Sequence, residues 1–214
     1  MNTPRKPPRA PGRPAADATV QRELLLNTAV DLFSHQGIQA TSLRAIAERA
    51  GVTPALLNYY FGGKDGLVDA LVEERFLPLL MRTAEGLQKA GDDPQELAGA
   101  FVREMSRNVA EQPWLPGLWV REILCEGGLL RERLIGRAGP LVPLLLAQRF
   151  AAAQARGALN PGLDPRLLVV SLIGLTLLPY AAAPIWRGVF ANPQIGDDAL
   201  VAHTLALLKG GMEP

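Results

Sequence analysis

Cysteine and histidine are scarce in this chain. Cys125 is the only cysteine, so no disulfide can form within one chain. The two histidines, His35 and His203, lie far apart and have no cysteine partner at a metal-binding spacing. We therefore expect no metal site and no cofactor, and the single cysteine fits the reducing environment of the cytoplasm, where we expect the protein to act.

Aromatic residues, strand patterns and catalytic motifs are also sparse or missing. Aromatic residues make up 6% of the 214 residues and hydrophobic residues 48%, a balance that favours aliphatic helix packing over a β-sandwich. No long stretch alternates between apolar and polar residues as a half-buried strand does. The sequence contains no G-x-S-x-G, no glycine-rich phosphate loop and no H-E-x-x-H motif. These absences predict an all-α protein that is not an enzyme.

Only one uncharged run is long enough to cross a membrane. This run, LLVVSLIGLTLLPYAAAPIW, covers residues 167–186 between two arginines. It contains two prolines and a glycine, and helices enclosed within an all-α dimer are apolar on all sides as well. We therefore expect a buried helix here and no membrane partner, with a membrane-tethered protein as the alternative.

Positive charge is concentrated toward the N-terminus. Residues 1–64 hold eight Lys or Arg and four Asp or Glu, a net charge of +4, whereas residues 65–214 hold fourteen and seventeen, a net charge of −3. Residues 1–16 combine five prolines with four basic residues and show no apolar periodicity, which predicts a disordered basic arm. The arm is either a solvated tail or a segment that follows DNA phosphates or enters a minor groove. The asymmetry indicates that this end of the molecule meets a polyanion.

Apolar periodicity predicts three helices in the N-terminal part of the chain. The first covers residues 18–36 and stops at Gly37. The second begins after Thr41 or Ser42, whose hydroxyl groups suit an N-cap. The third begins with Pro54 at its first helical position, where the missing N–H has no cost. Two short helices joined by a tight glycine turn form the arrangement of a helix-turn-helix.

The third predicted helix carries side chains that a protein core does not need. Asn58 can form a bidentate pair with adenine, and Tyr59 can touch a thymine methyl group or bond a phosphate. Tyr60 continues this polar and aromatic run, although its spacing from Leu57 also puts it on the inward face. The hydroxyl and N–H groups at the start of the second helix suit a phosphate. The candidate DNA contacts are Thr41, Ser42, Arg44, Thr53, Pro54, Ala55, Asn58, Tyr59, Tyr60 and Lys64.

The stretch TSLRAIAERAGVTPALLNYYFGGKDGL, residues 41–67, resembles the DNA-binding signature of the TetR family of bacterial transcriptional regulators. Family members have a similar T-T-x-x-x-I-A-x-x-A-G-V-S run, then an aromatic Y-x-F end followed by S-K-E. The resemblance covers about residues 20–70. It implies that Thr53–Tyr60 is the recognition helix and that Lys64 contacts phosphate. Asn58 replaces a common Tyr and Gly63 a common Ser, and the resulting N-Y-x-F-G-G-K form is similar to that of a minority subgroup.

The resemblance also implies the organisation of the whole chain. We expect about nine helices, with the basic arm at 1–16, a helix-turn-helix domain at 17–64 and a ligand-binding and dimerisation domain at 65–214. The implied protein is a homodimer that covers a palindromic DNA operator and represses transcription. A small-molecule effector of unknown identity then shifts the population toward a state whose recognition helices no longer match successive major grooves.

Beyond residue 64 the pattern predicts longer helices separated by proline and glycine. Pro78 is expected to kink the first of them, and two prolines are expected to bend or divide the helix over 129–157. The mostly apolar segments 166–190 and 197–209 are expected to form a four-helix dimer interface. Large or soft side chains in apolar surroundings are candidates for the ligand pocket, although core or interface is the commoner role of such groups. These candidates are Trp114, Trp119, Cys125, Tyr180 and Trp186.

Two other functions remain open at this point. The chain could be a helical bundle that binds a small molecule or another protein and has no DNA function, or it could be a membrane-tethered regulator. The basic arm and the outward Asn58 and Tyr59 favour the DNA-binding regulator over both.

Overall fold

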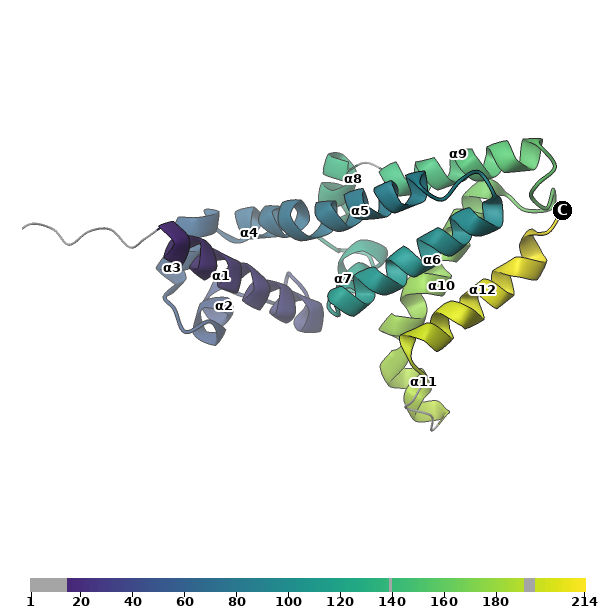
Figure 1. Ribbon diagram of the computed structural model, residues 1–214. Coiled ribbons are helices and arrows are strands. Elements are labelled where there is room, and N and C mark those ends of the chain that lie inside the picture. The colour runs from purple at the N-terminus through teal and green to yellow at the C-terminus, as the bar shows by residue number, and fades with distance from the viewer. Residues whose placement is uncertain (1–14, 139, 191–194) are drawn as a thin grey trace, which may run out of the picture.

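The computed structural model describes residues 15–138, 140–190 and 195–214, and these residues contain helices and turns but no β-strand. The all-α prediction is therefore confirmed. Three helices form a small head at one end, and a larger helical body lies at the other (Figure 1). Residues 1–14 of the predicted basic arm lie outside the described residues. The predicted boundary of the arm at residue 16 is wrong, because the first helix already begins at Ala15.

The head contains the three helices that the sequence predicts. Ser42 caps the second helix, because its Oγ accepts the Ala45 N–H at 3.1 Å. Gly62 ends the third helix at a φ of 68°, in the left-handed region that favours glycine. The head helices are α1 (Ala15–Gln36), α2 (Leu43–Arg49) and α3 (Pro54–Phe61).

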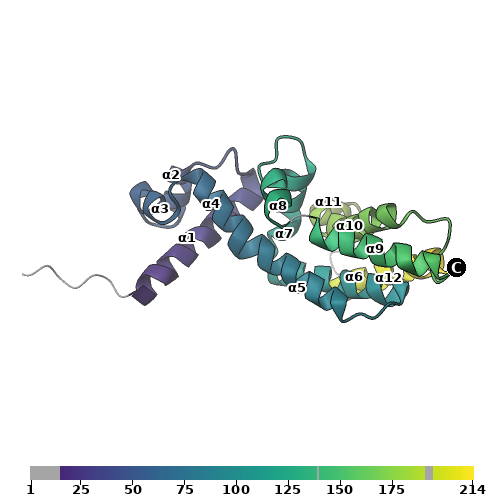
Figure 2. The same cartoon turned by 90° about the horizontal axis from the view of Figure 1, so that it is seen from above.

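One long, bent rod connects the head to the body (Figure 2). Its segments are α4 (Lys64–Leu71), the π-helical η1 (Val72–Phe76) and α5 (Leu77–Gln88). Pro78 has no N–H for the Glu74 carbonyl, and the Arg75 guanidinium donates to that carbonyl instead at 3.0 Å. The irregularity expected at Pro78 is thus a π-helical turn that ends just before it.

The body contains the remaining helices, and prolines separate several of them. The helix predicted over residues 129–157 is divided, since one helix ends at Ala138 and the next begins at Leu141, directly after Pro140. The body elements are α6 (Pro94–Glu111), α7 (Leu115–Leu118), the π-helical η2 (Trp119–Leu124), α8 (Arg131–Ala138), α9 (Leu141–Ala155), α10 (Pro165–Ala181), α11 (Ala183–Val189) and α12 (Asp197–Met212).

Two clusters of buried side chains hold these elements together. The first fills the head and continues into the body, because Phe33 and Leu57 of the head belong to the same cluster as Leu118 and Leu177. The second lies within the body and includes Phe101 and the side chains of α9, α10 and α12 that face it. The head is therefore packed against the body through a shared core, so that the position of one depends on the other.

The apolar run at residues 167–186 is divided between α10 and α11. In the described part of the chain, no single helix has the length and hydropathy needed to cross a membrane. Together α10 and α11 reach that length and composition, but the two helices are bent by 67° at the break between them. Leu168, Leu172 and Leu177 of α10 are buried in the protein core.

Candidate DNA-binding surface and effector cleft

Helix α3 has one buried face and one open face. Leu57 is fully buried and Phe61 is 8% exposed, and both belong to the core of the head. On the other side, Tyr59 is 80% exposed, and Asn58 and Ala55 are exposed as well. The exposed Thr53 and Pro54 lie at the start of the helix. This helix can therefore enter a groove with its N-terminal half first.

Tyr60 has a different position from its two neighbours in the sequence. Its side chain is half-buried and packs against the core of the head. The Tyr59 ring meets the Tyr60 ring edge-on, with 5.2 Å between the ring centroids. Phe61 is in turn covered by the Arg22 guanidinium, 4.8 Å from the ring centroid. Tyr60 thus supports the exposed tyrosine, as its inward spacing in the sequence predicts.

The start of α2 contributes two exposed candidates and one buried residue. Ser42 and Arg44 are both exposed. Thr41 is only 1% exposed, and its hydroxyl group donates to the Gly37 carbonyl at 2.7 Å. The expected role of Thr41 as a phosphate contact is therefore wrong, because its hydroxyl group is enclosed and already bonded.

Lys64 lies at the start of α4 and reaches back to the α1–α2 turn. Its Nζ donates to the Gln39 carbonyl at 3.0 Å. Gln39 is exposed, so this ammonium group is at the surface of the head beside the helix-turn-helix. An ammonium group has three donors, which leaves two for a phosphate while this bond persists.

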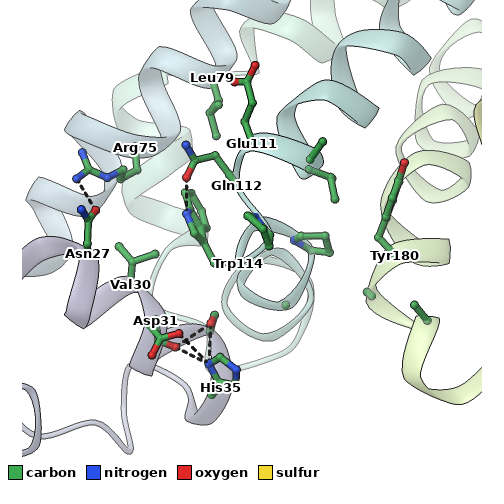
Figure 3. A pocket seen from close by; sticks show the side chains of 18 of the residues that line it. Asn27, Val30, Asp31, His35, Arg75, Leu79, Glu111, Gln112, Trp114 and Tyr180 are labelled. Atoms are coloured by element: carbon green, nitrogen blue, oxygen red, sulfur yellow. Dashed lines mark hydrogen bonds and ion pairs between the residues drawn. The ribbon is translucent and has the colours of Figure 1, made fainter. Parts of the chain in front are cut away.

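A cleft of about 1340 Å³ lies between the head and the body. Its walls come from α1, from η1 and α5, from the end of α6, and from α7, α10 and α11 (Figure 3). Two of the five predicted pocket residues, Trp114 and Tyr180, line it. The Trp114 indole N–H donates to Gln112 at 2.6 Å, and the Tyr180 hydroxyl lies 2.9 Å from that of Ser106. Burial raises the pKa of Tyr180 above its ordinary value, so this hydroxyl ionises even less readily than that of an exposed tyrosine.

Ion pairs form the wall of the cleft where α1 meets η1. Arg22 of α1 makes a bidentate pair with Glu74 at 2.5 and 2.6 Å, and Arg75 pairs in the opposite direction with Glu23 at 2.5 Å. The hydrogen bonds from Arg22 lower the pKa of the Glu74 carboxyl, although partial burial acts against this. Further along the wall, Arg82 pairs with Glu111 at 2.6 Å. The pairs of Arg22 and Arg75 connect the head to the rod, and the pair of Arg82 connects the rod to α6, beside the space that a ligand would occupy.

The match to a known family concerns the head. Residues 25–71 match the model described as bacterial regulatory proteins, tetR family. The helix-turn-helix of this chain is thus similar to that of the TetR family. Among its relatives, the transcriptional regulator BetI of Rhizobium meliloti is 33% identical over 101 residues, which cover 47% of this chain and 49% of BetI. UidR of Escherichia coli K12 is 23% identical over 204 residues, covering 92% of this chain and 94% of UidR.

Solved structures share the fold over nearly the whole chain. The ketosteroid transcriptional regulator KstR2 of Mycobacterium tuberculosis has a TM-score of 0.73 at 19% identity, covering 96% of this chain and all of KstR2. NalD of Pseudomonas aeruginosa, described as the secondary repressor of the MexAB-OprM multidrug efflux pump, has a TM-score of 0.66 at 24% identity, covering 92% and 98%. At these identities the likeness concerns the fold. The chain also spans about half the length of BetI in that alignment.

Three of the predicted pocket residues lie away from the cleft. Trp119 packs against the core shared by the head and the body. Cys125 is exposed at the end of η2. Trp186 is held by its indole N–H, which donates to the Pro179 carbonyl at 2.7 Å, and by the guanidinium of Arg187 at 5.2 Å from its ring. These three side chains therefore do not line the cleft, because aromatic or soft character does not tell which way a side chain faces.

The sequence analysis missed the charged lining of the cleft. Glu74 and Arg75 lie in a mixed-charge stretch, E-E-R, that reads as a solvated helix face. A signal that was available is the matching R-E pair at residues 22 and 23, which is opposite in order to the E-R pair at 74 and 75. Only the packing of α1 on the rod shows that the two pairs meet.

Proposed function

We propose that this protein is a TetR-family transcriptional repressor that binds a palindromic operator as a homodimer and is released by a small molecule. The observation that carries the proposal is the open face of α3, where Asn58 and the 80% exposed Tyr59 stand on a helix whose opposite face is buried. A structural corner of a bundle does not need such a face. A protein that binds a bacterial DNA operator acts in the cytoplasm.

The proposed DNA contact has a base-reading part and a phosphate-binding part. Asn58 reads adenine in the major groove, and Tyr59 contacts a thymine methyl group or a phosphate. Arg44, Ser42 and the free N–H groups at the start of α2 bind the backbone, as does Lys64 beside the α1–α2 turn. The N-Y-x-F-G-G-K form supports membership of a separate subgroup. Asn58 lies on the open face of α3, where a change of side chain alters which DNA base is preferred.

The proposed dimer uses the apolar sides of α10 and α12 that the body leaves uncovered. Leu167, Val170 and Leu178 of α10 are exposed by 64%, 63% and 58%, and Leu207 of α12 by 54%. Small residues lie between them, including Gly174 of α10. When these sides pack against the same sides of a second copy, the two helices of each copy form a four-helix interface. The interface would hold the two α3 helices at the spacing of successive major grooves, about 34 Å.

The proposed effector site is the cleft between the head and the body. It is large enough for a small organic molecule, and Trp114 and Tyr180 offer aromatic surface at its walls. A ligand there meets both the head, through α1, and the body, through α7 and α10. It can therefore favour one arrangement of the head over another. The free energy of this shift equals the difference between the ligand's binding free energies for the two arrangements.

The test is selection of duplexes from a random pool by the purified protein, followed by affinity measurement at several salt concentrations. We expect a palindromic consensus whose binding falls steeply with salt, because several phosphates are contacted. The variant Asn58→Ala/Tyr59→Ala is the matched control, since both side chains project from the open face and their loss leaves the core intact. Equal binding of random and selected duplexes at 150 mM salt would contradict the proposal and favour a helical bundle without DNA function.

A further inference from the structure

Glu122 is a buried acidic residue at the boundary between the head and the body. It lies in η2 and is 4% exposed. Its Oε1 accepts the backbone N–H of Ile38 at 2.8 Å, and its Oε2 accepts the backbone N–H of Leu129 at 3.1 Å. In the described part of the chain it forms no ion pair. The carboxyl group is therefore satisfied by two backbone N–H groups, and loss of either would leave a buried acceptor without a partner.

The two partners of Glu122 belong to different parts of the molecule. Ile38 is fully buried in the α1–α2 turn and belongs to the core of the head. Leu129 lies in the loop after η2, and the next residue, Leu130, donates its N–H to the Glu122 carbonyl at 3.2 Å. One side chain thus joins the turn that precedes the helix-turn-helix to a loop of the body.

The α1–α2 turn has the shape that this contact requires. Gly37 has a φ of 88°, in the left-handed region that favours glycine. A Cβ atom at this position would lie 3.2 Å from Oε1 of Glu122 and 3.0 Å from Cδ of Arg121. Close approach of the turn to η2 therefore depends on the absence of a side chain at residue 37.

The helix directly before the segment that carries Glu122 faces the cleft. Trp114, Pro116 and Gly117, at the start of α7, line the cleft, and η2 follows α7 without a break. Figure 3 shows Trp114 near the end of α1 that carries Asp31 and His35. A ligand that displaces α7 must therefore either carry Ile38 with it through Glu122 or break a buried hydrogen bond.

We propose that Glu122 is the positioning residue that couples the cleft to the DNA-binding head. It transmits a displacement of α7 and η2 to Ile38, and from there through the core of the head to α2 and α3. This inference rests on the proposed function, since it assigns to one residue the connection between effector site and DNA surface. By reciprocity of linked sites, DNA bound to the head must also change the state of η2 and the loop after it.

The test uses a duplex selected from a random pool and needs no effector. Amide hydrogen exchange of residues 118–130 is measured with and without saturating duplex, in the wild type, in Glu122→Gln and in Glu126→Gln. Glu126 is an exposed acid four residues away and provides the same change of charge. In the wild type and in Glu126→Gln we expect the duplex to slow this exchange by about fivefold or more. In Glu122→Gln that effect is lost while residues 41–64 are still protected by DNA.

Each outcome decides between the two proposals. Protection of residues 41–64 with no change at 118–130 in the wild type overturns the role of Glu122 and leaves DNA binding intact. A response of Glu122→Gln equal to that of the wild type overturns it as well. Absence of any protection at 41–64 counts against the DNA function itself. Should Glu122→Gln fail to fold by circular dichroism, Gly37→Ala weakens the same contact from the opposite side and is expected to reduce the response at 118–130.

Discussion

At the scale of single residues, the open face of α3 assigns different tasks to adjacent side chains. Asn58 and Tyr59 are exposed, whereas Tyr60 packs against the core and meets the Tyr59 ring edge-on. Lys64 stands outside this helix and lies beside the α1–α2 turn. Substitution should therefore separate base preference from general affinity.

Asn58→Ala should relax base preference at one position of each half-site, and Lys64→Ala should weaken binding to all duplexes alike. The first change removes a bidentate base contact, worth about 1–3 kcal/mol of discrimination. The second removes about one phosphate contact and lowers the salt slope by about one. Affinities for a panel of single-base variants of the selected duplex, at three salt concentrations, measure both effects. The same pattern from both variants would contradict these roles.

Thr41→Val should lower stability and leave the salt dependence of DNA binding unchanged. The Thr41 hydroxyl bonds the Gly37 carbonyl in a buried position, and its loss should cost about 1 kcal/mol. Urea unfolding gives the change in the free energy of unfolding, and the slope of log affinity against log salt gives the number of phosphate contacts. Wild-type stability combined with a reduced slope would restore Thr41 as a phosphate contact.

At the scale of elements, crossed ion pairs hold α1 to the π-helical turn η1. Arg22 and Glu74 each keep about a third of their side-chain surface exposed, so solvent screens the pair. Pro78 lies in the first turn of α5, just after the π-helical turn, and the side chain of Arg75 donates to the Glu74 carbonyl that the proline leaves free. The rod is therefore irregular at the point where the head is attached to it.

Glu74→Gln should reduce the free energy of unfolding at pH 7 by less than about 1 kcal/mol, after allowance for screening. Arg22 lowers the folded-state pKa of Glu74 below 4.5, so the contribution is complete above that pH and is lost as the pH falls through the lower, folded-state value. Urea unfolding from pH 7 to pH 3 measures the difference, which should shrink in the acid range. Glu73→Gln, at a more exposed neighbour, is the control, and a difference that grows toward low pH would refute the assignment.

Apolar periodicity and the positions of glycine and proline predicted most of the helices. The helical turns that they did not predict depend on tertiary packing. Gly37, Gly62 and Pro140 end or precede helices as their backbone chemistry requires. The π-helical turns at residues 72–76 and 119–124 were not predicted, because a shift from α to π pairing leaves no apolar periodicity to detect. The first begins in the shared core and ends next to Pro78, and the second carries Glu122.

At the scale of the whole molecule, α10 and α12 expose apolar sides to solvent. A row of leucine and valine side chains over two adjacent helices exceeds the scattered exposure of a typical monomer surface. The same helices bury their other sides in the body. The four-helix interface expected from residues 166–190 and 197–209 therefore stays a prediction with a clear geometric basis.

Val170→Glu/Leu178→Glu should convert the dimer into a folded monomer with weaker operator binding. Two charges at the centre of an apolar interface cannot be paired by the symmetry-related copy, which carries the same charges. Sedimentation velocity measures the mass, and circular dichroism measures retained helix. Met81→Glu, a similar change at a residue of α5 that is 54% exposed, should remain dimeric. An unchanged mass in the double variant would place the interface elsewhere.

The sequence by itself determined the class of the fold, the positions of the head helices and the exposed face of α3, because helix periodicity, caps and breakers act over a few residues. It could not determine which aromatic side chains line the cleft, that Thr41 is enclosed, or that Glu122 bonds Ile38. Those facts join residues far apart in the chain, up to 84 positions for Glu122 and Ile38. Only the packing of the head on the body brings such residues together. A local sequence pattern does not say which other element a partly apolar helix face will contact.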